Sequence, residues 1–152
     1  MIIDAHLHLD DTKYKSAHEA AAALDLEREN VGISHCIVLH LLYQNWSMEE
    51  FAEALQAYPK LHGLVNLNPS DENCIEQMNT AIDELGYIGL KLHPRLQEFS
   101  IDHEDVRKLV SYCGEKNVPV LIDGFPDGTH LQRGFNAMSY ANLALACPDT
   151  NI

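Results

Sequence analysis

The chain has 152 residues, and 46% of them are apolar, which is enough to fill the core of one ordinary domain. We therefore expect one globular domain over residues 1–152. Its 23 acidic and 10 basic residues give a formal charge of -13, which repels phosphate backbones and anionic lipids. The composition argues against partners such as nucleic acid or a membrane surface.

The amino terminus has neither the basic flank nor the long apolar core of a secretion signal, and no apolar run reaches the length of a membrane span. We therefore expect a cytoplasmic protein. Its four cysteines form no Cys-x-x-Cys pair, so neither a zinc knuckle nor a redox motif is indicated. We expect buried, reduced thiols at Cys36, Cys74, Cys113 and Cys147.

The first predicted element is a strand over residues 2–9, an apolar run with a potential metal ligand at every second position. Side chains alternate between the two faces of a strand, so Asp4, His6 and His8 are predicted to point to one side. Two imidazoles at this spacing can bind one ion, whereas on a helix they would point to opposite sides. Hydrogen bonds within the protein are the alternative role for the histidines, and the His-x-His spacing favours the metal site.

Capping boxes mark the first two helices. The Ser-x-x-Glu pattern at Ser16 predicts a helix to about residue 30, which Gly32 stops. The same pattern at Ser47 predicts a helix that ends before Pro59, because the residue before a proline avoids helical geometry. The apolar segments that follow these helices are predicted strands, over residues 34–40 and 61–67.

The second half of the chain continues this alternation. Apolar residues at helical spacing predict a helix over residues 71–85, and Gly86 ends it. Asp102 is the predicted cap of a further helix that runs to about residue 116. The remaining predicted elements are a strand over 88–94, a strand over 118–124, a glycine- and proline-containing loop over 124–134 and a helix over 136–146.

Strands that alternate with helices on short connections form βαβ units and hence a parallel sheet. Two architectures fit, a doubly wound open sheet and a (β/α)8 barrel. An open sheet usually has a glycine-rich phosphate loop after its first strand, and the sequence has none. A barrel builds its site from the carboxyl ends of many strands. We predict an α/β fold of the TIM-barrel type, because the candidate polar residues follow different strands: His8, His40, Asn68, His93 and Asp123.

Residues 3–8, 89–94 and 118–123 resemble the amidohydrolase superfamily, specifically its amidohydrolase-2 branch. The resemblance implies a metal-binding barrel that hydrolyses or decarboxylates small molecules, with His6 and His8 as metal ligands. The family usually has a histidine at the end of the fifth strand, where this chain has Asp123. Because aspartate can bind zinc or a harder ion such as manganese, we expect Asp123 to be a third ligand.

The sequence accounts for about five strand-helix units, whereas a barrel has eight and usually about 250 residues. The resemblance implies a further histidine and an activating aspartate on strands beyond Ile152. We therefore expect either a piece of a longer protein or a natural chain that lacks the rest of the barrel. The first and fifth strands would then be uncovered edges, and we expect association into a homo-oligomer.

The expected function is metal-dependent hydrolysis of a small amide, lactone or ester. A divalent ion, zinc or alternatively manganese, would lower the pKa of bound water and polarise the substrate carbonyl. Lys91 and His93, which share a face of their predicted strand, are the expected catalytic residues. Other roles for Lys91 are a carboxylated bridge between two metals, or a cation that pairs with Asp4, Asp123 or a substrate carboxylate. Decarboxylation with the same ion and a non-catalytic remnant that keeps the fold both stay open.

Overall fold

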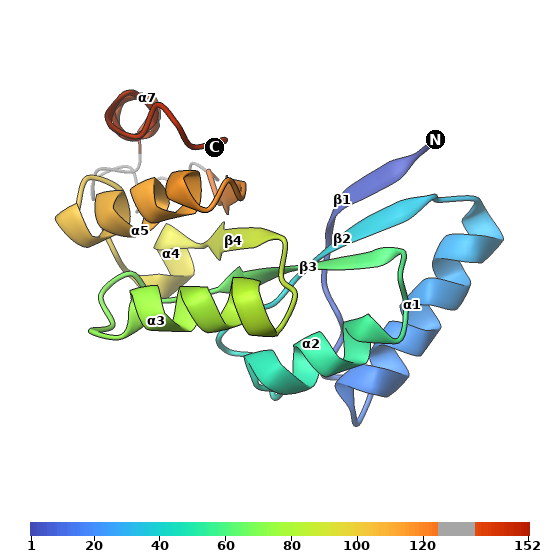
Figure 1. The fold of residues 1–152 in the computed structure, drawn as a ribbon. Coiled ribbons are helices and arrows are strands. Elements are labelled where there is room, and N and C mark those ends of the chain that lie inside the picture. Colours follow the sequence, from blue (N-terminus) through green and yellow to red (C-terminus); the bar gives the residue numbers. More distant parts are fainter. Residues whose placement is uncertain (125–135) are drawn as a thin grey trace. The chain divides into compact units, whose positions relative to one another are not determined.

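The computed structural model describes residues 1–124 and 136–152. The chain divides into two compact units, one formed by residues 1–66 and 79–88, the other by residues 67–78 and 89–152. In both units, strands alternate with helices along the chain (Figure 1). The predicted loop over residues 124–134 falls outside the described residues after Gly124.

Three parallel strands form the sheet of the first unit, each beside the next in chain order. Figure 1 shows them in blue, cyan and green. Their order and direction confirm the predicted βαβ connections within this unit. They are β1 (Ile3–Leu7), β2 (His35–Leu39) and β3 (Leu61–Asn66).

Helices α1 (Ala17–Val31) and α2 (Met48–Gln56) begin at the two predicted serine caps. The Ser16 hydroxyl accepts a hydrogen bond from a backbone N–H of the first turn, and Ser47 forms a reciprocal capping box with the glutamate three residues later. Gly32 ends α1 in the left-handed conformation, with φ at 73°. Both capping predictions are confirmed because they depend only on residues within one turn.

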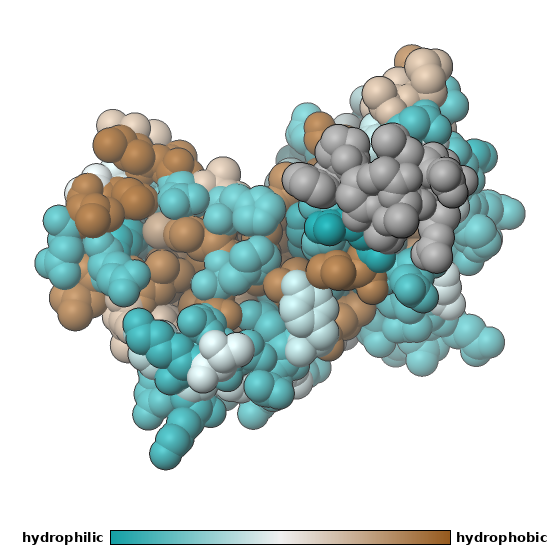
Figure 2. Space-filling model, turned by 180° about the vertical axis from the view of Figure 1, so that it is seen from behind, coloured by the Kyte–Doolittle hydropathy of each residue, from teal (hydrophilic) through white to brown (hydrophobic). Residues whose placement is uncertain are grey.

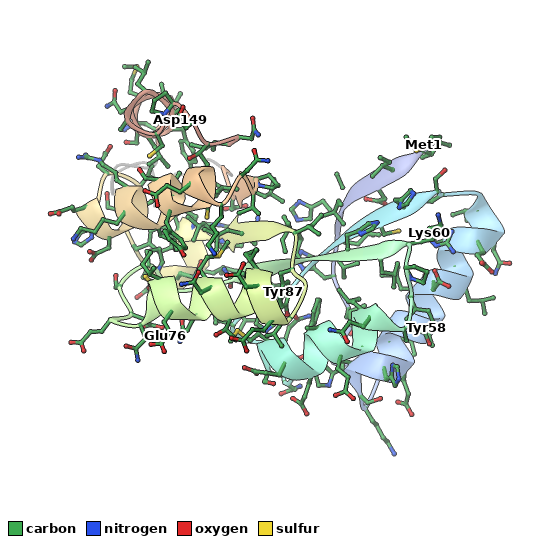
Figure 3. All side chains as sticks on the ribbon, in the orientation of Figure 1. Met1, Tyr58, Lys60, Glu76, Tyr87 and Asp149 are labelled. Atoms are coloured by element: carbon green, nitrogen blue, oxygen red, sulfur yellow. The ribbon has the colours of Figure 1, made fainter. Side chains whose placement is uncertain are left out.

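The core of the first unit is built around Phe51, which is fully buried. Its ring is stacked on Tyr87, with centroids 6.4 Å apart, and makes an edge contact with His40 at 5.3 Å. Tyr87, labelled in Figure 3, donates its hydroxyl to the backbone oxygen of Met48 at 2.8 Å. A Cβ on Gly63 would lie 2.9 Å from the Tyr87 ring, so this packing requires a residue without a side chain.

The second unit has two adjacent parallel strands, β4 (Gly89–Leu92) and β5 (Val120–Ile122). Its longest helix is α5 (Glu104–Glu115), whose apolar face is buried and fills the core of this unit. The strands predicted over 88–94 and 118–124 and the helices predicted over 102–116 and 136–146 are confirmed apart from their bounds. The last of these helices is α7 (Ala137–Ala146), and the short α4 (Pro94–Gln97) was not predicted.

The helix predicted over residues 71–85 starts later and changes its hydrogen bonding. Residues 68–74 form two successive turns, in which the N–H of Asp71 bonds to Asn68 and that of Cys74 to Asp71. The helix is therefore α3 (Cys74–Asn79), followed by a π-helical turn, η1 (Thr80–Glu84). Gly86, with φ at 78°, follows the helix as predicted.

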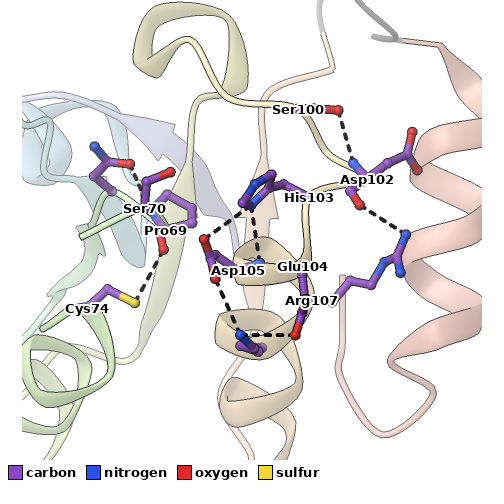
Figure 4. A network of polar contacts seen from close by, with 11 residues as sticks. Pro69, Ser70, Cys74, Ser100, Asp102, His103, Glu104, Asp105 and Arg107 are labelled. Carbon is purple, nitrogen blue, oxygen red and sulfur yellow. Dashed lines mark hydrogen bonds and ion pairs between the residues drawn. The ribbon is translucent and has the colours of Figure 1, made fainter. Parts of the chain in front are cut away.

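The prediction that Asp102 caps α5 was wrong by one residue. His103 is the cap, and its Nδ1 lies 3.4 Å from the N–H of Asp105, the contact drawn in Figure 4. The Asp102 carboxylate instead accepts the hydroxyl of Ser139 at 2.9 Å, and its backbone oxygen accepts from Arg107. Ser139 lies 37 residues away in sequence, so local patterns could not identify this partner.

All four cysteines are free and buried, as predicted. Burial raises the pKa of the Cys36 and Cys74 thiols, and that of Cys113 to about 12. The thiols of Cys36, Cys74 and Cys113 are therefore protonated and unreactive near neutral pH. In residues 1–124 and 136–152, no helix has the length and apolar character needed to cross a membrane.

Candidate functional site

The two histidines of the opening motif lie next to each other, with ring centroids 5.3 Å apart. His6 is in β1, and His8 follows the last residue of that strand. The Nδ1 of His8 lies 3.2 Å from the backbone oxygen of Leu39, and a carbonyl can only accept, so Nδ1 carries the proton. The lone pair of His8 is therefore on Nε2. A backbone carbonyl that orients a histidine in this way is the usual support of a metal ligand.

An irregular pairing within β1 changes which of its side chains share a face. Asp4 lies beside Cys36 and Leu7 beside Val38, so β1 has one more residue than β2 between these pairs. Because Cys36 and Val38 are two residues apart, Asp4 and Leu7 share a face. The predicted strict alternation, which puts Asp4 and Leu7 on opposite faces, was therefore wrong.

A second group of polar side chains gathers around Asp123, which directly follows β5. The Oδ2 of Asp123 lies 3.6 Å from Nδ1 of His93 and 3.7 Å from Nε of Arg95. Its backbone oxygen accepts the hydroxyl of Tyr140 at 2.7 Å. Lys91 is 1% exposed, and its charge interacts with Asp123. Both predicted catalytic residues therefore lie with Asp123 in one cluster, which we call the Asp123 cluster.

Sequence reasoning missed two members of the Asp123 cluster. Arg95 stands two residues after His93, and its place just beyond a strand end was a signal that could have identified it. Tyr140 comes from α7, 17 residues after Asp123 in sequence, and no local pattern links the two.

The Asp123 cluster is electrostatically unusual in this chain. Burial lowers the pKa of Lys91 against the opposing effect of Asp123. Burial also lowers the pKa of His93, again opposed by Asp123, while Lys91 and Arg95 lower it further. His93 is therefore neutral near pH 7. Lys91 and Arg95 bring two basic side chains to one carboxylate, in a chain whose formal charge is -13. This concentration of basic side chains suits a substrate anion.

The predicted metal ligands are divided between the two units. His6 and His8 belong to the first unit and Asp123 to the second. Within the part of the chain that the structure describes, no three His, Cys, Asp or Glu side chains form a metal-binding group. The adjacent histidine pair and the His8 tautomer fit a divalent ion, and the assignment of Asp123 as third ligand stays a prediction.

Two further polar residues at strand ends have local partners instead. His40 is 3% exposed, its Nε2 lies 3.4 Å from the backbone oxygen of Trp46, and burial lowers its pKa. Its Nδ1 has no hydrogen-bond partner among the described residues. Asn68 accepts a hydrogen bond from the N–H of Ser70 within a turn. The turn contact accounts for Asn68, and the contact with Trp46 accounts for one ring nitrogen of His40.

Solved structures confirm the predicted α/β fold of the TIM-barrel type. An uncharacterized TIM-barrel protein from Bordetella bronchiseptica matches with a TM-score of 0.74 and 18% identity, over 98% of this chain and 64% of that one. A probable 2-pyrone-4,6-dicarboxylic acid hydrolase from Acinetobacter baumannii, with citric acid bound, has a TM-score of 0.59 and 16% identity, over 80% of this chain and 48% of that one.

A third structure is 5-carboxyvanillate decarboxylase from Novosphingobium aromaticivorans with bound manganese. Its TM-score is 0.54 at 15% identity, over 97% of this chain and 58% of that one. The chain thus spans between 48% and 64% of the length of these three proteins. At such identities the likeness shows the fold alone.

The family is identified by comparison of the sequence with family models. A search of the curated proteins found no match. The family model Amidohydro_2, described as Amidohydrolase, matches residues 3–152, which is nearly the whole chain. The resemblance carried by the His-x-His motif and the strand of Lys91 is thereby confirmed. The chain belongs to the amidohydrolase family, in its amidohydrolase-2 branch.

Proposed function

We propose that this chain carries the metal-binding and substrate-binding residues of a hydrolase that acts on a small organic acid with an amide, lactone or ester bond. The observation that carries the proposal is the adjacent pair His6 and His8, with Nδ1 of His8 bound to the carbonyl of Leu39. Membership of the amidohydrolase family supports the reaction class. The named acid substrates of two structural neighbours support the substrate class.

His6 and His8 would hold a divalent ion through ring nitrogens, and Asp123 is the proposed third ligand. When bound, the ion supplies Lewis-acid catalysis, since it acidifies water and polarises a carbonyl group. Imidazole and carboxylate ligands suit zinc, and the manganese bound by one neighbour makes manganese the second choice.

The chain's own residues have distinct proposed roles in this reaction. The carbonyl of Leu39 fixes the tautomer and orientation of His8. Lys91 and Arg95 bind a carboxylate of the substrate, because they supply the positive charge of the Asp123 cluster. His93, neutral near pH 7, accepts a proton during the reaction.

Decarboxylation is the second candidate function. The cations beside Asp123 would hold a carboxylate equally well for this reaction, and one structural neighbour is a decarboxylase. A non-catalytic chain that keeps the fold is the third possibility. Association between copies and a cytoplasmic location also stay predictions.

An assay that follows two products separates these functions. We expect the zinc-loaded chain to hydrolyse at least one member of a panel of lactones, amides, esters and aromatic carboxylates, and a chelator to abolish the activity. Release of CO₂ without hydrolysis would favour the decarboxylase. A version that continues into the downstream reading frame is assayed in parallel, because the chain spans only part of its structural neighbours. Inactivity of both versions would favour the non-catalytic chain.

A further inference from the structure

A second histidine pair lies outside the site described above. His35 is the first residue of β2, and His62 is the second residue of β3. Nδ1 of His35 and Nε2 of His62 are 2.9 Å apart. The two strands are hydrogen-bonded neighbours, with Ile37 beside His62, so the pair connects their amino ends. Both side chains are half-buried.

The geometry of this pair indicates a shared proton. The ring planes differ by 20°, so the two rings are nearly parallel. The centroids are 5.1 Å apart while the two facing nitrogens are 2.9 Å apart, so the rings meet edge to edge through these nitrogens. The two facing nitrogens thus point at each other across 2.9 Å. An ion between them would need about 2 Å to each nitrogen, hence about 4 Å in total along this line. A proton fits this spacing, and one ring donates while the other accepts.

Proton balance gives the pair two steps of titration. In the neutral pair, one of the two protons lies between the facing nitrogens. A first extra proton can bind an outer nitrogen, Nε2 of His35 or Nδ1 of His62, and the contact survives. A second extra proton leaves no acceptor, so two N–H groups and two positive charges face each other. The contact must then open.

The surroundings oppose the doubly charged state. Burial lowers the pKa of His62, and the charges of His35 and Lys60 lower it further. Lys60, labelled in Figure 3, precedes β3 directly. On the β1 side, the neighbour of His35 is the apolar Ile3, and the next residue, Asp4, points to the other face. Among the described residues, the neighbours named here are Lys60 and Ile3, and neither is a carboxylate that could offset a second positive charge on the histidine pair.

We propose that His35 and His62 form a proton-sharing pair that links the amino ends of β2 and β3 at neutral pH and opens in mild acid. The unfolded chain binds protons with the ordinary imidazole pKa of about 6.5, so below that pH it takes up more protons than the folded pair. Stability is therefore full above about pH 6.5, falls as the pH decreases, and levels off once the folded pair is fully protonated.

The test combines ring titration with unfolding of the whole chain. By nitrogen-15 NMR of the unmodified chain at pH 7.5, we expect Nδ1 of His35 and Nε2 of His62 to share one proton, and the pKa of His62 to lie below the ordinary imidazole value. The variant His62→Gln keeps a donor and acceptor near Nε2 but cannot titrate, and His35→Asn does the same near Nδ1. Between pH 7.5 and 5.0, the unfolding equilibrium constant should rise about tenfold more in the parent than in either variant, the factor expected for one pK unit.

The control variant is His18→Gln, which removes an exposed histidine of the same unit and should keep the parent's pH dependence. The double variant should match the single ones, because either substitution already removes the shared proton. The absence of a proton between Nδ1 of His35 and Nε2 of His62 at pH 7.5 would overturn the proposal. So would stabilisation of the parent, but not of His62→Gln, by Ni²⁺ or Zn²⁺ at pH 7.5, since that result would make the pair a metal site.

Discussion

Replacing His6 and His8 together with alanine is expected to weaken Zn²⁺ binding at least about a hundredfold. Loss of a supporting hydrogen bond alone costs a metal site about 10- to 100-fold in affinity, and this change removes two proposed ligands. The exposed position of both rings means that the double variant should still fold. Competition with a chelating dye measures the dissociation constant, and elemental analysis measures the bound metal.

A matched control removes two histidines from elsewhere. His18 and His103 are exposed and lie outside both histidine pairs, so the double variant His18→Ala and His103→Ala should bind zinc as the parent does. Equal zinc affinity in the parent and in the His6 and His8 variant would mean that the opening motif has a structural role. Asp123→Asn then tests the third ligand separately, and an unchanged affinity would place Asp123 outside the metal's ligands.

The largest loss of stability is expected for Phe51→Ala. Phe51 is fully buried against Tyr87 and His40, and its removal leaves a cavity that these rings cannot close. Truncation of a buried phenylalanine costs about 3–5 kcal/mol in the free energy of unfolding. Urea denaturation at neutral pH measures the change in midpoint and slope.

Two further variants serve as comparisons for the loss of stability in Phe51→Ala. Phe51→Leu retains most of the buried volume and should cost less than half as much as Phe51→Ala. Leu26→Ala, at a position of α1 that is 60% exposed, should change the free energy of unfolding by less than about 0.5 kcal/mol. A loss below about 1 kcal/mol for Phe51→Ala would contradict the packing described for the first unit.

The parts of the fold that could be predicted are those encoded within one or two turns of chain. Ser16 and Ser47 cap their helices through residues three positions away, and Gly32 stops α1 through its own conformation. The alternation of strands and helices follows from hydrophobic periodicity, which is also local. The barrel type was predicted from polar residues at the ends of different strands and from the lack of a glycine-rich loop after the first strand, and the family resemblance agrees with it.

The errors came from contacts between distant residues. The extra residue in β1 is visible only in its pairing with β2, and it places Asp4 on the same face as Leu7. The Asp102 carboxylate accepts a hydrogen bond from the Ser139 hydroxyl, whereas the sequence predicted that Asp102 caps a helix. In the site, His93 and Asp123 were predicted from their strand ends, whereas Tyr140 reached Asp123 from a separate helix. Such partners depend on tertiary packing, which a single sequence does not reveal.

The central claim is that the opening motif binds a metal through the Nε2 nitrogen of His8. Nitrogen-15 NMR of the histidine rings during a Zn²⁺ titration tests it most directly. The account predicts that zinc shifts the Nε2 signal of His8 together with one ring nitrogen of His6, while Nδ1 of His8 keeps its proton on the Leu39 carbonyl. Zinc-induced shifts at His35 and His62, with His6 and His8 unchanged, would contradict it.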